Sequence, residues 1–240
     1  MEKIYLIIIV TAIILRIFEK PIIYKLIDKS SKDIYYLKNF YSEDIKKNLK
    51  KLMYKASNKS YRFNNWVRKG SSISHHDMYD TPYEKIINII RCPETLSLIK
   101  KRTGLNLQFI PRSDPNQLSI LYYDQPSDGI DWHTDSNLYE GTRWACIYTI
   151  VNESNKKNKK FSSSKLKYKH NNKVYYINTE PNSLVLFKGD VLDHKVDKLN
   201  EGEARIVISF VLCDICSSKQ NLVNFFYGKI INLSFYGKLF

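Results

Sequence analysis

The sequence is poor in the residues that mark non-globular chains. Its 240 residues include 8 glycines and 7 prolines, which excludes a collagen-like or low-complexity protein. An apolar fraction of 43% and a charged fraction of 26% are those of a folded protein, because disordered chains contain few apolar residues. At this length the chain can form one domain with a sizeable core.

Cysteine is also scarce, with only Cys92, Cys146, Cys213 and Cys216. Four cysteines in a chain this long do not make a disulfide framework. Cys213 and Cys216 form a single CxxC pair, but a zinc site needs a second ligand pair and a redox site needs a thioredoxin-like context. We therefore expect ordinary reduced cysteines and, with them, a reducing compartment.

Acidic residues are fewer than basic ones: 24 Asp and Glu stand against 38 Lys and Arg, for a net charge of +14. This excess favours a polyanionic partner, either nucleic acid or an anionic membrane surface. The alternative is a compositional bias toward lysine, since arginine is the residue of specific phosphate recognition and most of the excess is lysine. The lysine cluster at 156–173 is interpreted either as a solvated loop or as a contact to phosphates or lipid headgroups.

Long apolar runs are absent except near the N-terminus, where residues 4–15 are almost unbroken. A membrane span needs about 20 residues, so this run is short unless Arg16 snorkels to the interface. Basic residues follow the run, and no small-x-small cleavage site is present. We expect residues 1–25 to be a hydrophobic membrane anchor of a single-pass membrane protein, with the body of the chain on the cytosolic side. The alternative is a hydrophobic helix packed on the domain or on a partner.

Apolar spacing predicts helices over 42–55 and 83–101, the second interrupted at Cys92-Pro93. Residues 58–80 are polar and show no period, so we expect a loop. Together, residues 26–106 are predicted to form a helical and loop support region.

From about residue 107 the pattern changes to short runs rich in Ile, Val, Leu and Tyr, separated by turn residues. These runs predict strands at 117–123, 144–151, 173–177, 183–187 and 204–212. Several strands without intervening helices favour an antiparallel sandwich or barrel, which we place at 107–218. Residues 219–240 are expected to form a C-terminal tail that packs on the barrel.

Within this region His133 and Asp135 are two residues apart, and His194 follows 59 residues after Asp135. Two residues at this spacing on an extended segment point to the same side and can bind one metal. Two histidines and a carboxylate suit a non-haem Fe(II) site with open positions. His75 and Asp77 show the same spacing but lie outside any strand pattern, so we expect them at the surface. Arg205 opens the last strand and supplies a cation suited to a carboxylate.

These residues resemble the Fe(II)/2-oxoglutarate-dependent dioxygenase superfamily, whose motif is HxD, a distant His, and Arg or Lys about ten residues later. The resemblance covers about 107–213 and implies a mainly β fold with N-terminal helices and a double-stranded β-helix (jelly roll) core. It implies that His133, Asp135 and His194 are the iron ligands and catalytic residues. Arg205 and Tyr123 would then bind the co-substrate 2-oxoglutarate, with O2 as oxidant and ascorbate as an accessory reductant.

The closest pattern is that of prolyl-4-hydroxylase-like catalytic domains, because Arg143 to Asn152 resembles their R-x8-N strand. Arg205 stands where that class usually has Lys. AlkB-type nucleic-acid demethylases share the context of His133, but this chain has Val211 at their second arginine and Leu121 at their asparagine.

Three functions compete. The first is a dioxygenase that hydroxylates a protein side chain and releases succinate and CO2, with a protein or peptide as partner. The second is an AlkB-like oxidative nucleic-acid demethylase, and the third is a non-catalytic membrane-associated jelly-roll protein. The sequence does not distinguish oligomeric states.

Overall fold

The computed structural model describes residues 33–65 and 67–219. The described helices are α2 (Glu43–Ala56), α3 (Glu84–Ile90) and α4 (Pro93–Thr103), with short 3-10 turns at Ser57–Lys59 and His75–Asp77. The strands are β1 (Ile34–Leu37), β2 (Tyr61–Asn64), β3 (Arg68–Ser74), β4 (Gln108–Phe109), β5 (Leu118–Tyr123), β6 (Gly129–His133), β7 (Arg143–Ser154), β8 (Leu166–His170), β9 (Lys173–Ile177), β10 (Ser183–Phe187), β11 (His194–Val196) and β12 (Glu203–Cys213).

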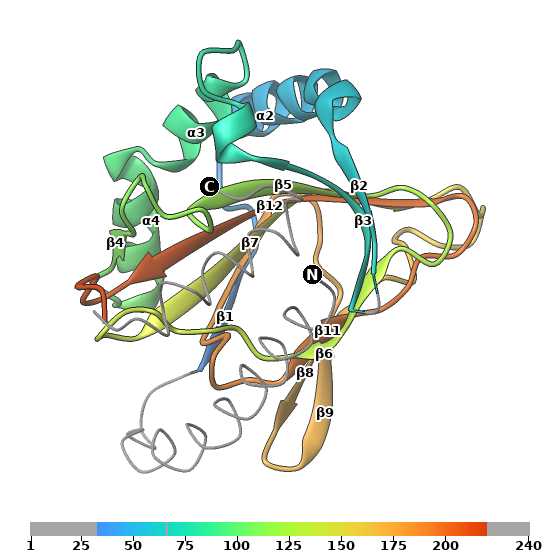
Figure 1. Cartoon of the computed structure of the whole chain (residues 1–240). Coiled ribbons are helices and arrows are strands. Elements are labelled where there is room, and N and C mark those ends of the chain that lie inside the picture. The colour runs from blue at the N-terminus through green and yellow to red at the C-terminus, as the bar shows by residue number, and fades with distance from the viewer. Residues whose placement is uncertain (1–32, 66, 220–240) are drawn as a thin grey trace, which may run out of the picture. The chain divides into compact units, whose positions relative to one another are not determined.

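All these strands belong to one 12-stranded antiparallel sheet in the order β1-β10-β7-β12-β5-β3-β6-β11-β8-β9, with β2 beside β3 and β4 beside β12. The sheet curls, as Figure 1 shows. Val185 and Phe187 near one end of the order pack against Leu166 and Val196 near the other end. The inner faces of the two ends therefore meet in one apolar layer, as in a jelly roll, which confirms the predicted fold class.

The three helices lie together on one side of the sheet (Figure 1) and cover the outer faces of β5, β7 and β12. Helix α2 begins at Ser42, whose hydroxyl accepts a hydrogen bond from the Ile45 amide at 3.4 Å. Leu49 and Met53 on its inner side are fully buried in the main core. Proline at the first position of α4 and Gly104 at its C-cap, with φ of 79°, fix the ends of that helix.

The predicted helices and strands are largely confirmed. The helix predicted over 42–55 is α2, and the one predicted over 83–101 is broken at Cys92-Pro93 into α3 and α4. The strands at 173–177 and 183–187 are observed at those bounds, and the other three differ by one to three residues at their ends.

The loop predicted over 58–80 is wrong, because this segment forms β2 and β3. Strand β3 pairs with both β5 and β6, so it joins the two halves of the sheet. Its residues Arg68–Ser74 include three serines, and burial by neighbouring strands determines its conformation. The predicted division into regions 26–106 and 107–218 stays a prediction, and residues 220–240 of the expected tail lie outside the described residues.

The structure corrects the predicted single-pass membrane topology with a cytosolic catalytic domain. Among the helices of residues 33–65 and 67–219, none has the length and apolar character needed to cross a bilayer. Residues 1–25, the predicted anchor, lie outside the described residues.

The expectation of reduced cysteines is wrong for one pair. Cys213 at the end of β12 and Cys216 form a disulfide with Cα atoms 5.5 Å apart, whereas Cys92 and Cys146 are free. Sequence spacing alone does not reveal this bond. The CxxC pair follows a strand, whereas the redox sites by which such a pair is recognised open a helix.

The surface position expected for His75 is also wrong, because its side chain is fully buried. It lies against His76, with ring centroids 3.8 Å apart, and edge-on to Tyr79. Burial, with a smaller contribution from His76, lowers the pKa of His75 from 6.5 to about 3.

We predict that His75 makes the fold sensitive to acid. Below pH 6.5 the unfolded chain binds a proton that the folded chain does not accept until about pH 3, so stability falls as pH decreases through this window. In the His75→Leu variant, the free energy of unfolding should depend less steeply on pH, by up to about 1.4 kcal/mol per pH unit. Urea denaturation between pH 7 and pH 4 measures this dependence. His170→Leu, at the exposed end of β8, is the control and should keep the wild-type slope. An unchanged slope in His75→Leu would contradict the prediction.

Candidate metal and co-substrate site

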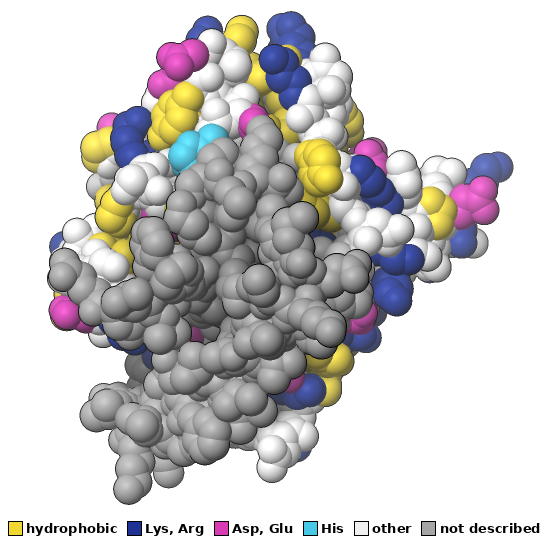
Figure 2. Space-filling model, viewed as in Figure 1, with side chains coloured by type: hydrophobic (Ala, Val, Ile, Leu, Met, Phe, Trp, Pro, Cys, Tyr) yellow, Lys and Arg dark blue, Asp and Glu magenta, His cyan; other side chains and the backbone are white. Residues whose placement is uncertain are grey.

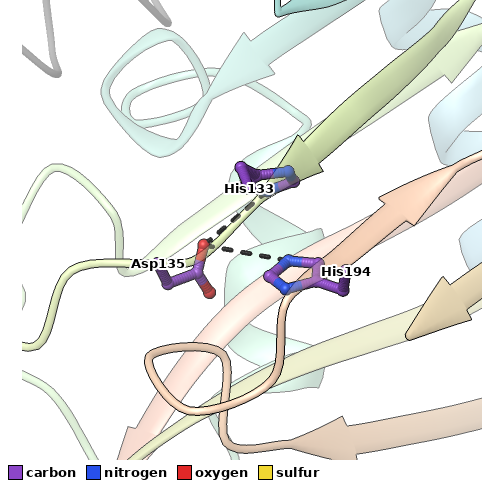
Figure 3. Close-up of side chains that lie close together, drawn as sticks. All are labelled: His133, Asp135 and His194. Carbon is purple, nitrogen blue, oxygen red and sulfur yellow. Dashed lines mark ion pairs between the residues drawn. The ribbon is translucent and has the colours of Figure 1, made fainter. Parts of the chain in front are cut away.

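His133 and His194 face each other across two neighbouring strands. They are direct partners in the pairing of β6 with β11, and their ring centroids are 4.2 Å apart. Asp135 follows the end of β6, and its amide donates to the Gly189 carbonyl at 2.8 Å. One ligand atom from each of the three residues lies within 4.8 Å of the others, and Figure 3 shows the side chains converging. The structure therefore brings together the three residues that the sequence predicts as metal ligands.

Both histidines have the same ring orientation. The Nδ1 atom of His133 lies 2.8 Å from the Asp131 carbonyl, and that of His194 lies 2.8 Å from the Leu192 carbonyl. A carbonyl accepts only, so each Nδ1 carries the hydrogen and donates it. Each Nε2 then keeps its lone pair and lies near Asp135, at 3.9 Å from Oδ1 for His133 and 4.0 Å for His194. This is the tautomer that a metal-binding histidine requires.

Two neighbours, Arg143 and Gly189, hold the Asp135 carboxylate in place. Arg143, the first residue of β7, donates to Oδ2 at 2.6 Å, while Oδ1 is the oxygen that faces the histidines. Gly189 lies against the same carboxylate, so closely that a Cβ at this position would collide with Oδ2. The arginine on one side and the bare backbone on the other leave the carboxylate one position, with Oδ1 toward the shared centre.

The charges of the three residues suit a cation. Burial lowers the pKa of His194 to about 4, so its ring is neutral at pH 7. Burial alone would raise the pKa of Asp135, but the charge of the neighbouring Arg143, with its hydrogen bond, holds it well below its usual range. Two imidazoles and one carboxylate are the donor set that fits Fe(II) with open positions, and the three ligand atoms lie close enough to converge on one ion.

Arg205 lies on the same inner side of the sheet and is 1% exposed. It pairs in register with Tyr123, and its Cζ lies 5.5 Å from the centre of the Tyr123 ring. Its Nε atom donates to the Thr179 hydroxyl at a long 3.5 Å. Among the described residues, Arg205 Nη2, the Tyr123 hydroxyl and the Thr149 hydroxyl are buried without a hydrogen-bond partner. Burial lowers the pKa of Arg205 below its ordinary value.

A buried guanidinium beside unused hydroxyls fits a carboxylate ligand. Leaving such a cation without an anion is costly, and a carboxylate oxygen would accept from both the guanidinium and a tyrosine hydroxyl. Arg205 and Tyr123 thus fit the distal carboxylate of a dicarboxylic 2-oxo acid, and Thr149, which pairs with Val207 on the same strand as Arg205, carries a further unused hydroxyl. The sequence pointed to the first two of these residues.

Sequence reasoning missed several residues around the site. Arg143 was noted for its place in the R-x8-N strand and not for its contact with Asp135, and Asn152 in the same motif is structural. The Asn152 side chain joins β7 to Ser162 and to the Thr179 carbonyl. Gly189 was visible only as a turn residue. His75 and Asp77 are not part of any potential metal-binding group among the described residues.

Comparisons with known proteins agree with this architecture. No protein-family model matches the chain, and no curated protein matches its sequence. Among solved structures, a 2OG-Fe(II) oxygenase family oxidoreductase from Burkholderia pseudomallei superimposes with a TM-score of 0.60 at 8% identity, covering 78% of this chain and 89% of the other. A Pseudomonas putida prolyl-4-hydroxylase gives a TM-score of 0.53 at 11% identity, with 75% and 93% covered.

A prolyl hydroxylase from Trichoplax adhaerens, solved in complex with a peptide fragment of the hypoxia inducible factor oxygen degradation domain, gives a TM-score of 0.55 at 16% identity, with 75% and 84% covered. At these identities the likeness concerns the fold. The chain therefore has the double-stranded β-helix fold of the 2-oxoglutarate- and Fe(II)-dependent oxygenases, and it carries a His-Asp-His candidate site in that fold.

We predict that Gly189→Ala weakens metal binding without unfolding the protein. The added Cβ displaces the Asp135 carboxylate, so Fe(II) affinity should fall about 10- to 100-fold, as when outer contacts of a metal ligand are lost. Anaerobic titration of Fe(II) into the metal-free protein measures this. Gly104→Ala, far from the site at a helix C-cap with φ of 79°, should lower stability through backbone strain but keep wild-type Fe(II) affinity, and is therefore the control for a loss of stability alone. Wild-type affinity in Gly189→Ala, with wild-type thermal unfolding, would contradict the role given to this contact.

Proposed function

We propose that this protein is an Fe(II)- and 2-oxoglutarate-dependent dioxygenase that hydroxylates a protein side chain, with succinate and CO2 as co-products. The observation that carries the proposal is the pairing of two separate features on one inner face: the His133, Asp135 and His194 cluster, and the buried, unsatisfied Arg205. A structural jelly roll has no use for a buried cation such as Arg205, since it costs stability unless an anionic ligand is bound.

In this proposal His133, Asp135 and His194 would hold the iron, with His133 Nε2, Asp135 Oδ1 and His194 Nε2 as the atoms that face one another. Arg143 keeps Asp135 ionised and oriented, and the backbone carbonyls of Asp131 and Leu192 hold the imidazole rings. Iron with bound 2-oxoglutarate supplies oxidation by O2 coupled to decarboxylation of the 2-oxo acid. Ascorbate would serve to restore the reduced metal.

Arg205 and Tyr123 then bind the distal carboxylate of 2-oxoglutarate. The arginine supplies the charge, and the tyrosine hydroxyl donates a second hydrogen bond from the neighbouring strand. Val207 and Leu121, which pair with each other next along the same two strands, are buried and would exclude water from the bound acid. These residues place the co-substrate; they do not take part in proton transfer.

A polypeptide substrate is favoured by the neighbour that was solved with a bound peptide. A nucleic-acid substrate has weaker support, because the described side chains visible in Figure 2 mix Lys and Arg with acidic and apolar residues. The non-catalytic alternative conflicts with the fit of all three ligand positions.

The central test is loss of function in His133→Ala. Wild-type protein, titrated anaerobically with Fe(II) and 2-oxoglutarate, should develop a metal-to-ligand charge-transfer absorption band and, in air, release succinate. The variant should show neither, because one of three ligands is removed. Arg102→Met, in α4 and outside the site, is the control and should behave as wild type. A wild-type protein without the band would refute the proposal.

A second prediction concerns the co-substrate. Arg205→Met should raise the KM for 2-oxoglutarate about 10- to 100-fold, since the lost hydrogen bonds are charge-assisted. It should also reduce the preference for 2-oxoglutarate over pyruvate, a 2-oxo acid that lacks the distal carboxylate. Succinate or acetate release at several concentrations of each acid measures both effects. An unchanged KM would place the distal carboxylate elsewhere.

A further inference from the structure

Strand β9 forms one end of the sheet and leaves an edge open. It pairs with β8, and the described residues contain no strand on its other side. The hairpin that joins the two strands turns through Asn171 and Asn172, with φ of 49° and 59°. Two residues with positive φ make the type I′ turn, whose twist matches that of the two strands and keeps them in register.

The turn identifies the backbone groups on the open edge. In a hairpin with a two-residue loop, the flanking residues His170 and Lys173 form a hydrogen-bonded pair, and such pairs then alternate. Tyr175 therefore bonds to Tyr168, while the amides and carbonyls of Val174 and Tyr176 point away from β8. The hydrogen bonds on the other side of β8 follow the same alternation. The Lys169 amide, which points away from β9, donates to the Asp193 carbonyl of the segment leading into β11.

Beyond Lys173 at its start, this edge lacks the usual protection. Exposed edge strands are commonly interrupted by proline, a bulge or an inward-pointing charge, because an open edge can add a further strand. The sequence of β9 is Lys-Val-Tyr-Tyr-Ile, regular in register throughout, with Val174 and Tyr176 exposed by 56% and 58%. Exposed large apolar side chains on a regular edge are typical of a binding surface.

The inner face that carries the candidate metal ligands extends to this open edge. His133 pairs with His194, His194 with Tyr168, and Tyr168 with Tyr175, so these side chains form one row across four strands. The two tyrosine rings stack with centroids 5.5 Å apart. The stacked pair thus extends the inner face from the candidate iron site to the open edge, and Figure 1 shows the β8–β9 hairpin projecting there.

The charge around the edge favours an acidic occupant. Lys165 lies 4.2 Å from the centre of the Tyr176 ring, and Lys173 opens β9. Among the described residues neither forms an ion pair, whereas Lys167 and Lys169 on β8 pair with Asp197 and Asp193. A second copy of this chain is disfavoured as occupant, because each copy carries a net charge of +14.

We propose that the open edge of β9 is a docking site for an extended acidic segment of the polypeptide substrate, which adds to the sheet as a further strand. This proposal rests on the proposed function, according to which the substrate is a polypeptide. The added strand lies three strand spacings from β11, roughly 14 Å. The hydroxylated residue is therefore at least about four residues from the docked segment along the substrate chain.

Val174→Pro tests the site with little risk to the fold. Proline removes the amide hydrogen on the open edge and leaves the hydrogen bonds to β8 intact, and edge strands tolerate it in that position. Val174→Thr keeps the amide and is the matched control. The probes are a fluorescein-labelled acidic peptide of alternating Glu and Val, and the same peptide with Lys in place of Glu. Fluorescence anisotropy with the full-length chain measures binding.

The acidic peptide should bind the wild-type protein and Val174→Thr, and bind Val174→Pro about tenfold more weakly, since the hydrogen bond donated by the Val174 amide is lost. The lysine peptide should not bind the wild-type protein. Joint replacement Lys165→Glu and Lys173→Glu should reverse the preference between the peptides. Equal binding of the acidic peptide to Val174→Pro and wild type, or none to wild type, would overturn the proposal. Concentration-dependent dimerisation that Val174→Pro abolishes would also overturn it, with a second copy as the occupant.

Binding of the probe needs neither iron nor 2-oxoglutarate, so the docking site and the oxygenase activity fail separately. If the metal-free protein binds the acidic peptide but no charge-transfer band forms, the proposed function fails and the peptide site stands. If the band forms and the peptide does not bind, only the docking proposal fails. Val174→Pro should leave the substrate-independent turnover of 2-oxoglutarate unchanged.

Discussion

Ile130 and His133 both face the interior of the barrel although they are three residues apart, a spacing that a regular strand would place on opposite faces. Their partners on β11, Val196 and His194, are two residues apart, and the extra residue of β6 is accommodated by a register shift between the two pairs. Such a bulge re-aims a side chain. Without it either the apolar Ile130 or the ligand His133 would point outward, so the metal cluster and the core around it depend on this one irregularity.

Two arginine side chains lie in the same interior, and the protein compensates the charge of only one of them. Arg143 is buried against Asp135, so its charge is compensated within the protein and the ion pair serves to orient a ligand. Arg205 is more deeply buried, yet it forms no ion pair among the described residues. An uncompensated buried cation raises the free energy of the empty protein, and an arriving dicarboxylate removes that cost. Under the proposed function, the fold bears the desolvation of Arg205 before the acid binds, which would increase selectivity for an acid with a second carboxylate.

Local spacing made the core of the site predictable from the sequence. His133 and Asp135 are two residues apart, and the apolar runs that became β7, β10 and β12 show which segments flank them. Strands β3 and β8 were missed because they contain serines or lysines, and the strands on either side determine their conformation. The Arg143 contact was missed for a related reason: ligand and arginine are joined by a loop, whose path no residue pattern encodes.

That loop is held by the last described segment of the chain. Between Asp135 and Arg143, the amides of Glu140 and Gly141 donate to the carbonyls of Ser217 and Ile215 at 3.0 and 3.1 Å. The Thr142 amide donates to the Asp214 carboxylate at 2.7 Å, inside the short loop that the Cys213–Cys216 disulfide closes. A metal ligand on a loop is positioned only as well as the loop is supported. The CxxC pair, which has no zinc partner, thus shapes the segment that holds the connection between Asp135 and its arginine.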